Sequence, residues 1–234
     1  MSINVKHIAI VMDGNRRWAK NRNMSGEQGH REGIKIFRKV IDWCLECKLE
    51  YLTAYVFSTE NWSRSKGEVD FLMSAIVENF SKYREEALKK NVRVRVLGTR
   101  ERLSDELKSV ITAIQEDTKR CTGFNLNLAF NYGGRQEIVE AVRAISAKIL
   151  LKELSLDEID EDLLAGYMYT KEIPDPELII RTGGEQRVSN FLTWQSTYSE
   201  FVFLDVLWPD FKPEEHLKFA LSEIEGRTRR YGGG

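Results

Sequence analysis

The sequence predicts one α/β domain over residues 1–234, built on a mostly parallel six-stranded sheet flanked by helices. Three observations indicate this fold class. The length of 234 residues suits one large domain and is short for two. Short apolar runs alternate with long amphipathic segments, which is typical of parallel sheets covered by helices. No internal repeat, low-complexity tract or Pro/Gly-rich linker interrupts that alternation.

Six short apolar runs are the expected strands, and most are apolar throughout, as in strands covered on both faces. They are His7–Met12, Tyr51–Phe57, Val92–Leu97, Phe124–Phe130, Leu178–Arg181 and Phe201–Val206. The third run alternates, so we expect an edge strand with Arg93 and Arg95 in water. Helical patterns lie between and after the strands, near residues 30–48, 68–90, 100–119, 135–152 and 213–225.

Composition narrows the class of protein. Hydrophobic residues make up 42% and charged residues 30%, and the net charge of −1 argues against a general nucleic-acid binder. No apolar run approaches the roughly 18 residues that a membrane span requires. The segment Met1–Met12 lacks the pattern of a signal peptide. We therefore expect a cytoplasmic protein.

The three cysteines fit a reducing compartment and offer no disulfide framework. Cys44 and Cys47 form a C-x-x-C, but no second Cys pair completes a zinc site. Cys44 is also in phase with Phe37 and Ile41 on the apolar face of a predicted helix. We therefore expect Cys44 to pack in the core.

Polar loops rich in Gly, Asn and Arg follow four of the strands, at residues 13–17, 58–62, 131–135 and 181–185. The carboxyl ends of parallel strands share one edge of a sheet, where open α/β folds bind ligands. Glycine loops and helix N-termini suit phosphate groups, and guanidinium groups bind phosphate oxygens. Five arginines lie near this edge by position: Arg16, Arg17, Arg135, Arg181 and Arg187. The sequence therefore predicts a phosphate site there.

The kind of phosphate ligand is only partly specified. The sequence has neither a P-loop nor a G-x-G-x-x-G after any strand, which disfavours P-loop mononucleotides and Rossmann dinucleotides. Aromatic residues beside the loops indicate an apolar portion of the ligand, with core packing as the alternative: Trp18, Phe57, Trp62, Phe130 and Trp194.

Carboxylates near this edge are candidate Mg²⁺ ligands, because Mg²⁺ is commonly held by one or two carboxylates together with substrate phosphates. Asp13 follows the first strand, and Glu185 and Glu200 lie near the fifth and sixth. A turn or helix-capping role is the alternative for Asp13. His30 could donate to a phosphate or pack in the core.

Long motifs then resemble one known family. They are Met12-Asp-Gly-Asn-Arg-Arg-Trp-Ala-Lys20, Gly29-His30-x-x-Gly33, Phe57-Ser-Thr-Glu-Asn-Trp62, Asn131-Tyr-Gly-Gly-Arg135, Ile180-Arg-Thr-Gly-Gly-Glu-Gln-Arg-Val-Ser-Asn-Phe-Leu192, Trp208-Pro-Asp-Phe211 and Arg229-Arg-Tyr-Gly-Gly233. In this order they resemble the cis-prenyltransferases, the group that includes undecaprenyl diphosphate synthase. The resemblance runs from about residue 6 to 233.

The resemblance implies a homodimer with a parallel sheet and an elongated hydrophobic tunnel that is closed by helices. It implies Mg²⁺-dependent condensation of isopentenyl diphosphate with an allylic prenyl diphosphate, such as farnesyl diphosphate, to give a polyprenyl diphosphate with a new cis double bond. The absence of D-D-x-x-D, the metal motif of the all-helical trans-synthases, agrees with it. It also leaves room for a peripheral membrane contact in product release.

The same resemblance assigns roles by position. The allylic diphosphate site comprises Asp13, Gly14, Asn15, Arg17 and His30, with Asp13 also engaging Mg²⁺; Arg16 and Trp18 of the same motif are further substrate-binding candidates. The isopentenyl diphosphate site comprises Arg181, Arg187 and Ser189, and Glu200 is a metal contact from the partner subunit's side. A mobile segment over the substrates comprises Ser58, Asn61, Trp62 and Arg64. The catalytic candidates are Asp13, Ser58 and Asn61, and the base is either Asp13 or the released diphosphate.

The chain departs from the family pattern at three positions. Gly26 stands where many relatives have an Arg, and we hypothesise that Arg16, where many have Gly, supplies that charge. Ser65 replaces a usual Pro, which predicts a looser mobile segment, and Gln186 replaces the His of some relatives. A non-catalytic partner subunit is the alternative function, but such subunits would be expected to lose the Asp13 or the Arg181–Ser189 motif, and this chain has both.

Product length is the last expectation. The resemblance places Val56 and Phe124 along the tunnel, where relatives that make the long bacterial carrier lipid tend to have the smaller Ala and Leu. Added volume in a close-packed interior causes strain. We therefore hypothesise a short or medium chain, with compensation by smaller neighbouring residues as the alternative.

Overall fold

The computed structural model describes residues 5–225, and within them the chain forms a six-stranded sheet in the order β3-β4-β2-β1-β5-β6. The strands are β1 His7–Val11, β2 Tyr51–Ser58, β3 Arg93–Leu97, β4 Asn125–Tyr132, β5 Leu178–Arg181 and β6 Glu200–Phe203. Every neighbouring pair is parallel, which confirms the predicted sheet. Strand order reverses between β1 and β5, and open α/β sheets bind ligands at such a switch point.

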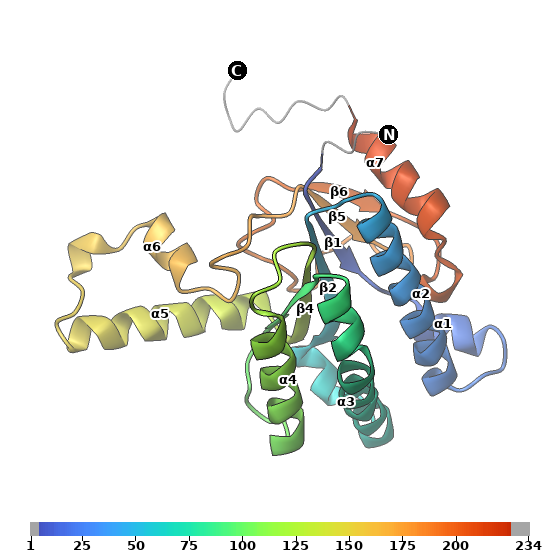
Figure 1. Ribbon diagram of the computed structural model, residues 1–234, viewed down its shortest axis with the longest axis horizontal. Helices are drawn as coiled ribbons and strands as arrows, with labels where there is room; N and C mark the ends of the chain where they lie inside the picture. Colours follow the sequence, from blue (N-terminus) through green and yellow to red (C-terminus); the bar gives the residue numbers. More distant parts are fainter. Residues whose placement is uncertain (1–4, 226–234) are drawn as a thin grey trace.

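The predicted helices are present with shifted ends (Figure 1). The helices are α1 Asn15–Lys20, α2 Gly26–Glu46, α3 Lys66–Lys89, α4 Asp105–Thr118, α5 Gly134–Leu150, α6 Glu161–Gly166 and α7 Lys218–Ile224; short 3-10 turns cover Thr59–Ser63, Leu156–Glu158 and Trp208–Asp210, and a π turn covers Pro213–Leu217. The short helices α1 and α6 were not predicted from the sequence. The motif Arg229–Gly233 lies outside the described residues.

Serine caps fix where three of the long helices begin. The side chain of Ser25 accepts from the backbone N–H of Gln28 at the start of α2, and Gln28 returns a bond to Ser25. The side chains of Ser65 and Ser104 accept from the backbone N–H groups of Glu68 and Leu107 at the starts of α3 and α4. Such caps satisfy N–H groups that have no partner inside the helix. Ser65, which replaces the family's usual Pro, therefore has a structural role here.

The sheet carries a hydrophobic cluster on each face. The larger one joins Ile8 and Ile10 of β1 to apolar residues of α2, α3, α4 and α7. Cys44 is fully buried in it, which confirms the expected core packing of this thiol. The smaller cluster joins Ala9 and Val11 to connecting segments on the opposite face, while α5 extends away from the sheet (Figure 1). The larger cluster is the one that leaves space for a ligand.

Strand β3 lies at an edge of the sheet as predicted, but the expectation that both of its arginines lie in water was wrong for Arg95. The Arg95 side chain is 15% exposed and donates to Asn125 Oδ1 at 2.7 Å. Glu172 lies within ion-pair distance of both Arg93 and Arg95. The segment that carries Glu172 therefore covers Arg95, a tertiary contact that strand alternation does not reveal.

Among residues 5–225, no helix combines the length and the apolar character that a membrane span needs.

Candidate functional site

Four polar loops meet at the carboxyl edge of the sheet, as the sequence predicted. Asp13 follows β1, Ser58 ends β2, Asn131 lies near the end of β4, and Arg181 ends β5. Because all four strands are parallel and adjacent in the sheet, these residues come from segments far apart in the chain but lie at one edge. This edge is the candidate site.

Asn190 ties three of these loops together. Its Nδ2 donates to Glu60 Oε1 at 2.8 Å, and its Oδ1 accepts from the backbone N–H of Arg135 at 2.9 Å. Its backbone oxygen also accepts from the N–H of Gly134 at 2.8 Å. Asn190 therefore holds the loops after β2, β4 and β5 in one arrangement.

Arg181 is the charged residue most deeply set in this edge, with 5% of its surface exposed. Its Nη2 donates to Asp13 Oδ2 at 3.0 Å, and its Nη1 donates to Ser189 Oγ at 2.8 Å. Arg17 Nη2 lies 3.4 Å from the same Asp13 oxygen. Two guanidinium groups therefore share one carboxylate. The net positive charge and the fork geometry suit a phosphate group.

Ser189 reaches Arg181 through an unusual backbone. Ser189, Asn190 and Leu192 have φ values of 50°, 64° and 46°, in the left-handed region that non-glycine residues rarely adopt. Such residues cost about 1–3 kcal/mol each and persist when the surrounding contacts fix them. The hydrogen bonds of Asn190 hold this backbone in place. The held backbone in turn orients the Ser189 side chain toward Arg181.

Two glycines allow the start of α1 to pack closely against neighbouring segments. Gly14 has φ 116°, and a Cβ there would lie 2.9 Å from Leu207 Cα. A Cβ on Gly33 of α2 would lie 2.1 Å from Asn15 Oδ1. The Asn15 Oδ1 atom is buried without a hydrogen-bond partner. The N-terminus of α1 and its Asn15 side chain are thus held against α2.

A second charged cluster is centred on Glu68, in the first turn of α3. Its Oε1 accepts from Arg64 Nη1 at 2.9 Å and lies 3.2 Å from His30 Nε2. Its Oε2 lies 3.8 Å from Arg16 Nη1. The Glu68 side chain is 12% exposed, whereas that of Arg16 is 65% exposed. One carboxylate therefore brings together groups from α1, α2 and the segment before α3.

Burial lowers the pKa of His30 below its usual value of 6.5, although the hydrogen bond and charge of Glu68 oppose that shift. The imidazole is therefore mainly neutral near pH 7. A neutral His30 offers a single N–H donor, and the tautomer decides whether that donor faces Glu68 or a ligand. Desolvation favours the neutral form in this partly closed site.

The segment after β2 is held by its own hydrogen bonds. Asn61 Oδ1 accepts from the Ser58 backbone N–H at 3.2 Å. Trp62 Nε1 donates to Asn131 Oδ1 at 2.8 Å, and its ring meets Phe57 edge-on with centroids 5.3 Å apart. These contacts anchor the segment to β2 and β4.

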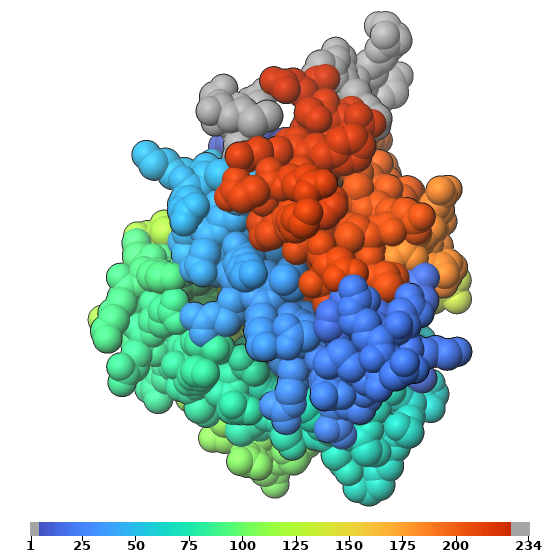
Figure 2. Space-filling view, turned by 90° about the vertical axis from the view of Figure 1, so that its right-hand side faces the viewer, coloured from blue at the N-terminus to red at the C-terminus, as the bar shows by residue number. Residues whose placement is uncertain are grey.

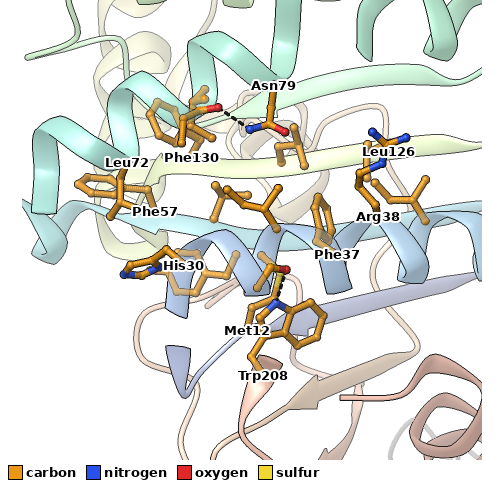
Figure 3. A pocket seen from close by; sticks show the side chains of 18 of the residues that line it. Met12, His30, Phe37, Arg38, Phe57, Leu72, Asn79, Leu126, Phe130 and Trp208 are labelled. Carbon is orange, nitrogen blue, oxygen red and sulfur yellow. Dashed lines mark hydrogen bonds between the residues drawn. The ribbon is translucent and has the colours of Figure 1, made fainter. Parts of the chain in front are cut away.

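An apolar cavity of about 730 Å³ begins at these polar groups and runs between α2, α3 and the sheet (Figure 3). Its polar lining at this end includes eight of the candidates: Asp13, Asn15, His30, Ser58, Asn61, Arg64, Arg181 and Ser189. The apolar lining comes mainly from α2, α3, β2 and β4, and includes Phe37, Leu72 and Phe130. A volume of this size holds a drug-sized ligand.

Seven of the candidates are not among the residues that line the cavity: Gly14, Arg16, Arg17, Trp18, Trp62, Arg187 and Glu200. Trp18 Nε1 donates to Asp210 Oδ1 at 2.7 Å, and Arg22 stacks on the Trp18 ring at 4.2 Å. The Arg187 side chain is 60% exposed and pairs with Glu185. Glu200 begins β6 in register with Leu178, so within the subunit it lies at the amino end of the strands, opposite Asp13.

Asp13 is the residue of this edge that best fits a metal ion. Among the described residues no group of three or more His, Cys, Asp and Glu side chains is placed to hold a metal. Mg²⁺ does not need such a group, because one or two carboxylates together with substrate phosphates and water satisfy it. The partly exposed Asp13 carboxylate at the mouth of the cavity meets that requirement.

Sequence reasoning missed Glu68 and Asn190 as organising residues. Ser65 followed by Glu68 has the S-x-x-E spacing of a helix start, which could have placed Glu68 in a first helical turn facing the loop. No comparable pattern marks Asn190, whose role depends on left-handed backbone and contacts between distant loops.

Comparison with known proteins now adds to this geometry. The sequence profile of the undecaprenyl diphosphate synthase family of prenyltransferases matches residues 11–232. The ditrans,polycis-undecaprenyl-diphosphate synthase of Micrococcus luteus, named as specific for (2E,6E)-farnesyl diphosphate, is 47% identical over 228 residues, or 97% of this chain and 91% of that protein. The isoprenyl transferase of Bacillus subtilis is 47% identical over 97% of this chain and 87% of that protein.

Solved structures agree with the sequence comparison. Lavandulyl diphosphate synthase from Lavandula x intermedia, in complex with dimethylallyl diphosphate, superposes with a TM-score of 0.93 at 34% identity, over 99% of this chain and 100% of that one. A probable undecaprenyl diphosphate synthase from Campylobacter jejuni superposes with a TM-score of 0.80 at 34% identity, over 98% and 99% of the two chains.

Proposed function

This chain belongs to the undecaprenyl diphosphate synthase family of prenyltransferases, and we propose that it condenses isopentenyl diphosphate with an allylic prenyl diphosphate such as farnesyl diphosphate. The chain is a transferase, as its named relatives are. One observation carries the proposal: a cationic mouth at the carboxyl edge opens into an apolar cavity of about 730 Å³. That combination suits a diphosphate head with a hydrocarbon tail.

Two diphosphates need two groups of donors. For the isopentenyl diphosphate we propose Arg181 with Ser189, because these side chains already point to each other at the end of β5, and Arg187 beside them. For the allylic diphosphate we propose the N-terminus of α1 from Gly14, the Asn15 and Arg17 side chains, and His30. The partnerless Arg181 Nε is consistent with a donor whose partner, a phosphate oxygen, arrives with the substrate.

Asp13 would hold Mg²⁺ against the diphosphates. The ion, when bound, neutralises the negative charge that develops on the allylic diphosphate as it leaves. Arg17 and Arg181 donate to the same region and add fixed positive charge without reorganising. Proton removal from the isopentenyl unit needs a weak base. We propose that either the Asp13 carboxylate or the released diphosphate is that base.

The cavity walls would protect the allylic cation. Phe57 and Phe130 present aromatic rings, and apolar wall residues such as Ile34 offer no nucleophile. Ser58 and Asn61 would order the segment over the substrates. We also propose a homodimer in which a second copy supplies Glu200 to the metal, with product release at a membrane surface. Exposed apolar residues support an interface: Val139, Val142 and Leu150 of α5 and Phe203 of β6.

The test of this function is direct. Purified protein is incubated with farnesyl diphosphate, labelled isopentenyl diphosphate and Mg²⁺, and products are separated by chromatography. Extension of the chain by one or more labelled units supports the proposal. If label enters product only after another subunit of the family is added, the chain is a non-catalytic partner; if it never enters product, the proposal fails.

Arg16→Gly is expected to raise the KM for the allylic diphosphate about tenfold, which corresponds to about 1.4 kcal/mol. Arg16 lies 3.8 Å from Glu68 and is the cation that we propose in place of the family arginine absent at Gly26. Steady-state kinetics with varied allylic substrate measure the change. Arg22→Gly, which removes the cation stacked on Trp18, is the control. An unchanged KM in Arg16→Gly would show that Arg16 is a surface residue only.

Val56→Ala is expected to lengthen the product by at least one isoprene unit. Val56 lines the cavity, so a smaller side chain adds space for the growing chain, and we propose a short or medium product for the unaltered protein. Phe124 is buried in the same core but is not among the cavity-lining residues, so we now assign the effect to Val56. Val40→Ala, in the core but off the cavity, is the control. An unchanged product distribution, or eleven-unit chains from the unaltered protein, would contradict the idea.

A further inference from the structure

Asn190 lies between a proposed substrate group and the segment that we place over the substrates, residues 58–64. The residue before it is Ser189, whose Oγ accepts from Arg181 Nη1 at 2.8 Å. On its other side, Asn190 Nδ2 donates to Glu60 Oε1 at 2.8 Å. Glu60 belongs to the 3-10 turn Thr59–Ser63, and both Glu60 and Asn190 line the cavity. We call this hydrogen bond the Asn190–Glu60 link.

The start of α5 fixes the orientation of the Asn190 amide. Its Oδ1 and its backbone oxygen accept from the N–H groups of Arg135 and Gly134, which have no partner inside the helix. Gly133, which precedes α5, has no side chain that could cap them. A Cβ on Gly133 would lie 2.8 Å from Asn190 Nδ2 and 2.6 Å from Thr59 Oγ1, so the three loops pack closely. Because Oδ1 faces α5, Nδ2 is directed toward the turn that carries Glu60.

Tyr55 of β2 holds the backbone on which Ser189 and Asn190 lie. Its hydroxyl donates to the backbone oxygen of Ser189 at 3.3 Å and lies 3.4 Å from that of Tyr132. The Tyr55 ring also stacks on Phe191, with centroids 4.5 Å apart. The residues on both sides of Asn190 are therefore fixed to the sheet. The positions of Ser189 Oγ and Asn190 Nδ2 depend on one held stretch of backbone, so a shift in one is transmitted to the other.

The Glu60 side of the link lies at the surface. Glu60 is exposed, and Figure 2 shows this part of the chain, in turquoise, on the outside of the molecule. Desolvation acts to raise the pKa of Glu60, but hydrogen bonds, that of Asn190 first, lower it below the usual value of 4.5. The carboxylate is therefore ionised near pH 7 and accepts a charge-assisted hydrogen bond. The link joins the turn to the loop after β5, whereas the bond from Trp62 to Asn131 joins it to β4.

We propose that Asn190 is a positioning residue for the condensation, and that the Asn190–Glu60 link couples the isopentenyl diphosphate subsite to segment 58–64. The inference rests on the proposed function, because it takes the ligand of Arg181 and Ser189 to be isopentenyl diphosphate. A diphosphate bound there fixes Ser189, and through the same backbone it fixes the amide that donates to Glu60. Coupling between two sites is reciprocal, so an ordered segment strengthens diphosphate binding by the same factor.

An exchange of the two functional groups tests the link. Asn190→Asp keeps an oxygen for the Arg135 N–H but places a carboxylate, which has no donor, against Glu60. Glu60→Gln added to it returns a donor, because the Gln Nε2 can donate to the new carboxylate. Asn190→Asp with Glu60→Ala is the matched control, since it has the same net charge as the exchange variant but no donor. Rescue by Gln and not by Ala separates the hydrogen bond from the change of charge beside the subsite.

Two measurements are made on each protein. The KM for isopentenyl diphosphate is expected to rise about tenfold in Asn190→Asp and in the Ala control, and to return to within about threefold of the unaltered value in the exchange variant. Hydrogen exchange of residues 58–64 is expected to slow on addition of isopentenyl diphosphate in the unaltered protein and the exchange variant, and not in the other two. The midpoint of thermal unfolding is expected to stay the same in all four, because each keeps the oxygens that accept from α5.

The outcomes distinguish the coupling from the function on which it rests. If the unaltered protein makes product but the exchange variant behaves like the Ala control, or Asn190→Asp changes neither KM nor exchange, the function stands and the coupling is overturned. If no protein makes product, yet isopentenyl diphosphate slows exchange of residues 58–64 in the unaltered protein and the exchange variant alone, the coupling stands and the proposed function fails. If isopentenyl diphosphate does neither in the unaltered protein, both fail.

Discussion

Asp13→Ala is expected to lower kcat by about 10²–10³-fold while the protein stays folded. Removal of one preorganised electrostatic group from an active site commonly costs this much, about 2.7–4 kcal/mol. Asp13 is the carboxylate proposed to present Mg²⁺ to the allylic diphosphate, and it also holds Arg17 and Arg181 in place. The measurement is single-turnover condensation at saturating substrates, which separates the chemical step from binding.

The loss of a carboxylate beside a buried arginine also affects stability. Arg181 would keep Ser189 Oγ but lose its charged partner, and a buried charge without its partner is destabilising. Asp13→Asn is therefore the companion variant, since its amide oxygen still accepts from Arg181 but binds Mg²⁺ poorly. Both variants are expected to be folded by circular dichroism and to show the same reduction in kcat, about 10²–10³-fold. More than a tenth of the normal rate in either one would remove Asp13 from its central role.

The fold could be predicted because apolar residues recur at clear spacings along its long helices and form short continuous runs in its strands. The apolar runs that became β1 and β5 and the amphipathic patterns of α2 and α3 span enough residues to be recognised. Helices α1 and α6 have six residues each, too few to show a periodicity, and α1 directly follows Gly14, a residue typical of loops, whose φ is 116°. Their structure depends on packing against other elements.

The sequence predicted where the site lies in the fold, but not which side chains contact one another there. Parallel strands bring Asp13 and Arg181 to one edge whatever the details, so their proximity follows from strand order. The pairing of His30 with Glu68 depends on how α2 crosses α3, and so does that of Arg38 with Glu86. Helix crossing is set by side-chain packing between segments about 40–50 residues apart, and no local sequence pattern records it.

Arg181→Ala is expected to lower kcat/KM for isopentenyl diphosphate by 10²-fold or more, with most of the loss in KM. Arg181 is 5% exposed and its guanidinium is oriented by Asp13 and Ser189, so it needs no reordering to meet a phosphate. A hundredfold loss corresponds to about 2.8 kcal/mol, within the range for a buried charge-assisted contact. Arg181→Lys keeps the charge but loses the planar fork, so it is expected to recover little of the lost activity.

Arg187→Ala is the matched comparison for Arg181→Ala. Arg187 belongs to the same loop and the same proposed subsite, but its side chain is 60% exposed and paired with Glu185. Water screens an exposed cation, so the loss in kcat/KM is expected to be about tenfold rather than a hundredfold. Varying isopentenyl diphosphate at a saturating allylic substrate gives both constants. If the two variants lose activity equally, or if KM for isopentenyl diphosphate stays unchanged in Arg181→Ala, burial and preorganisation at the end of β5 are not what bind this substrate.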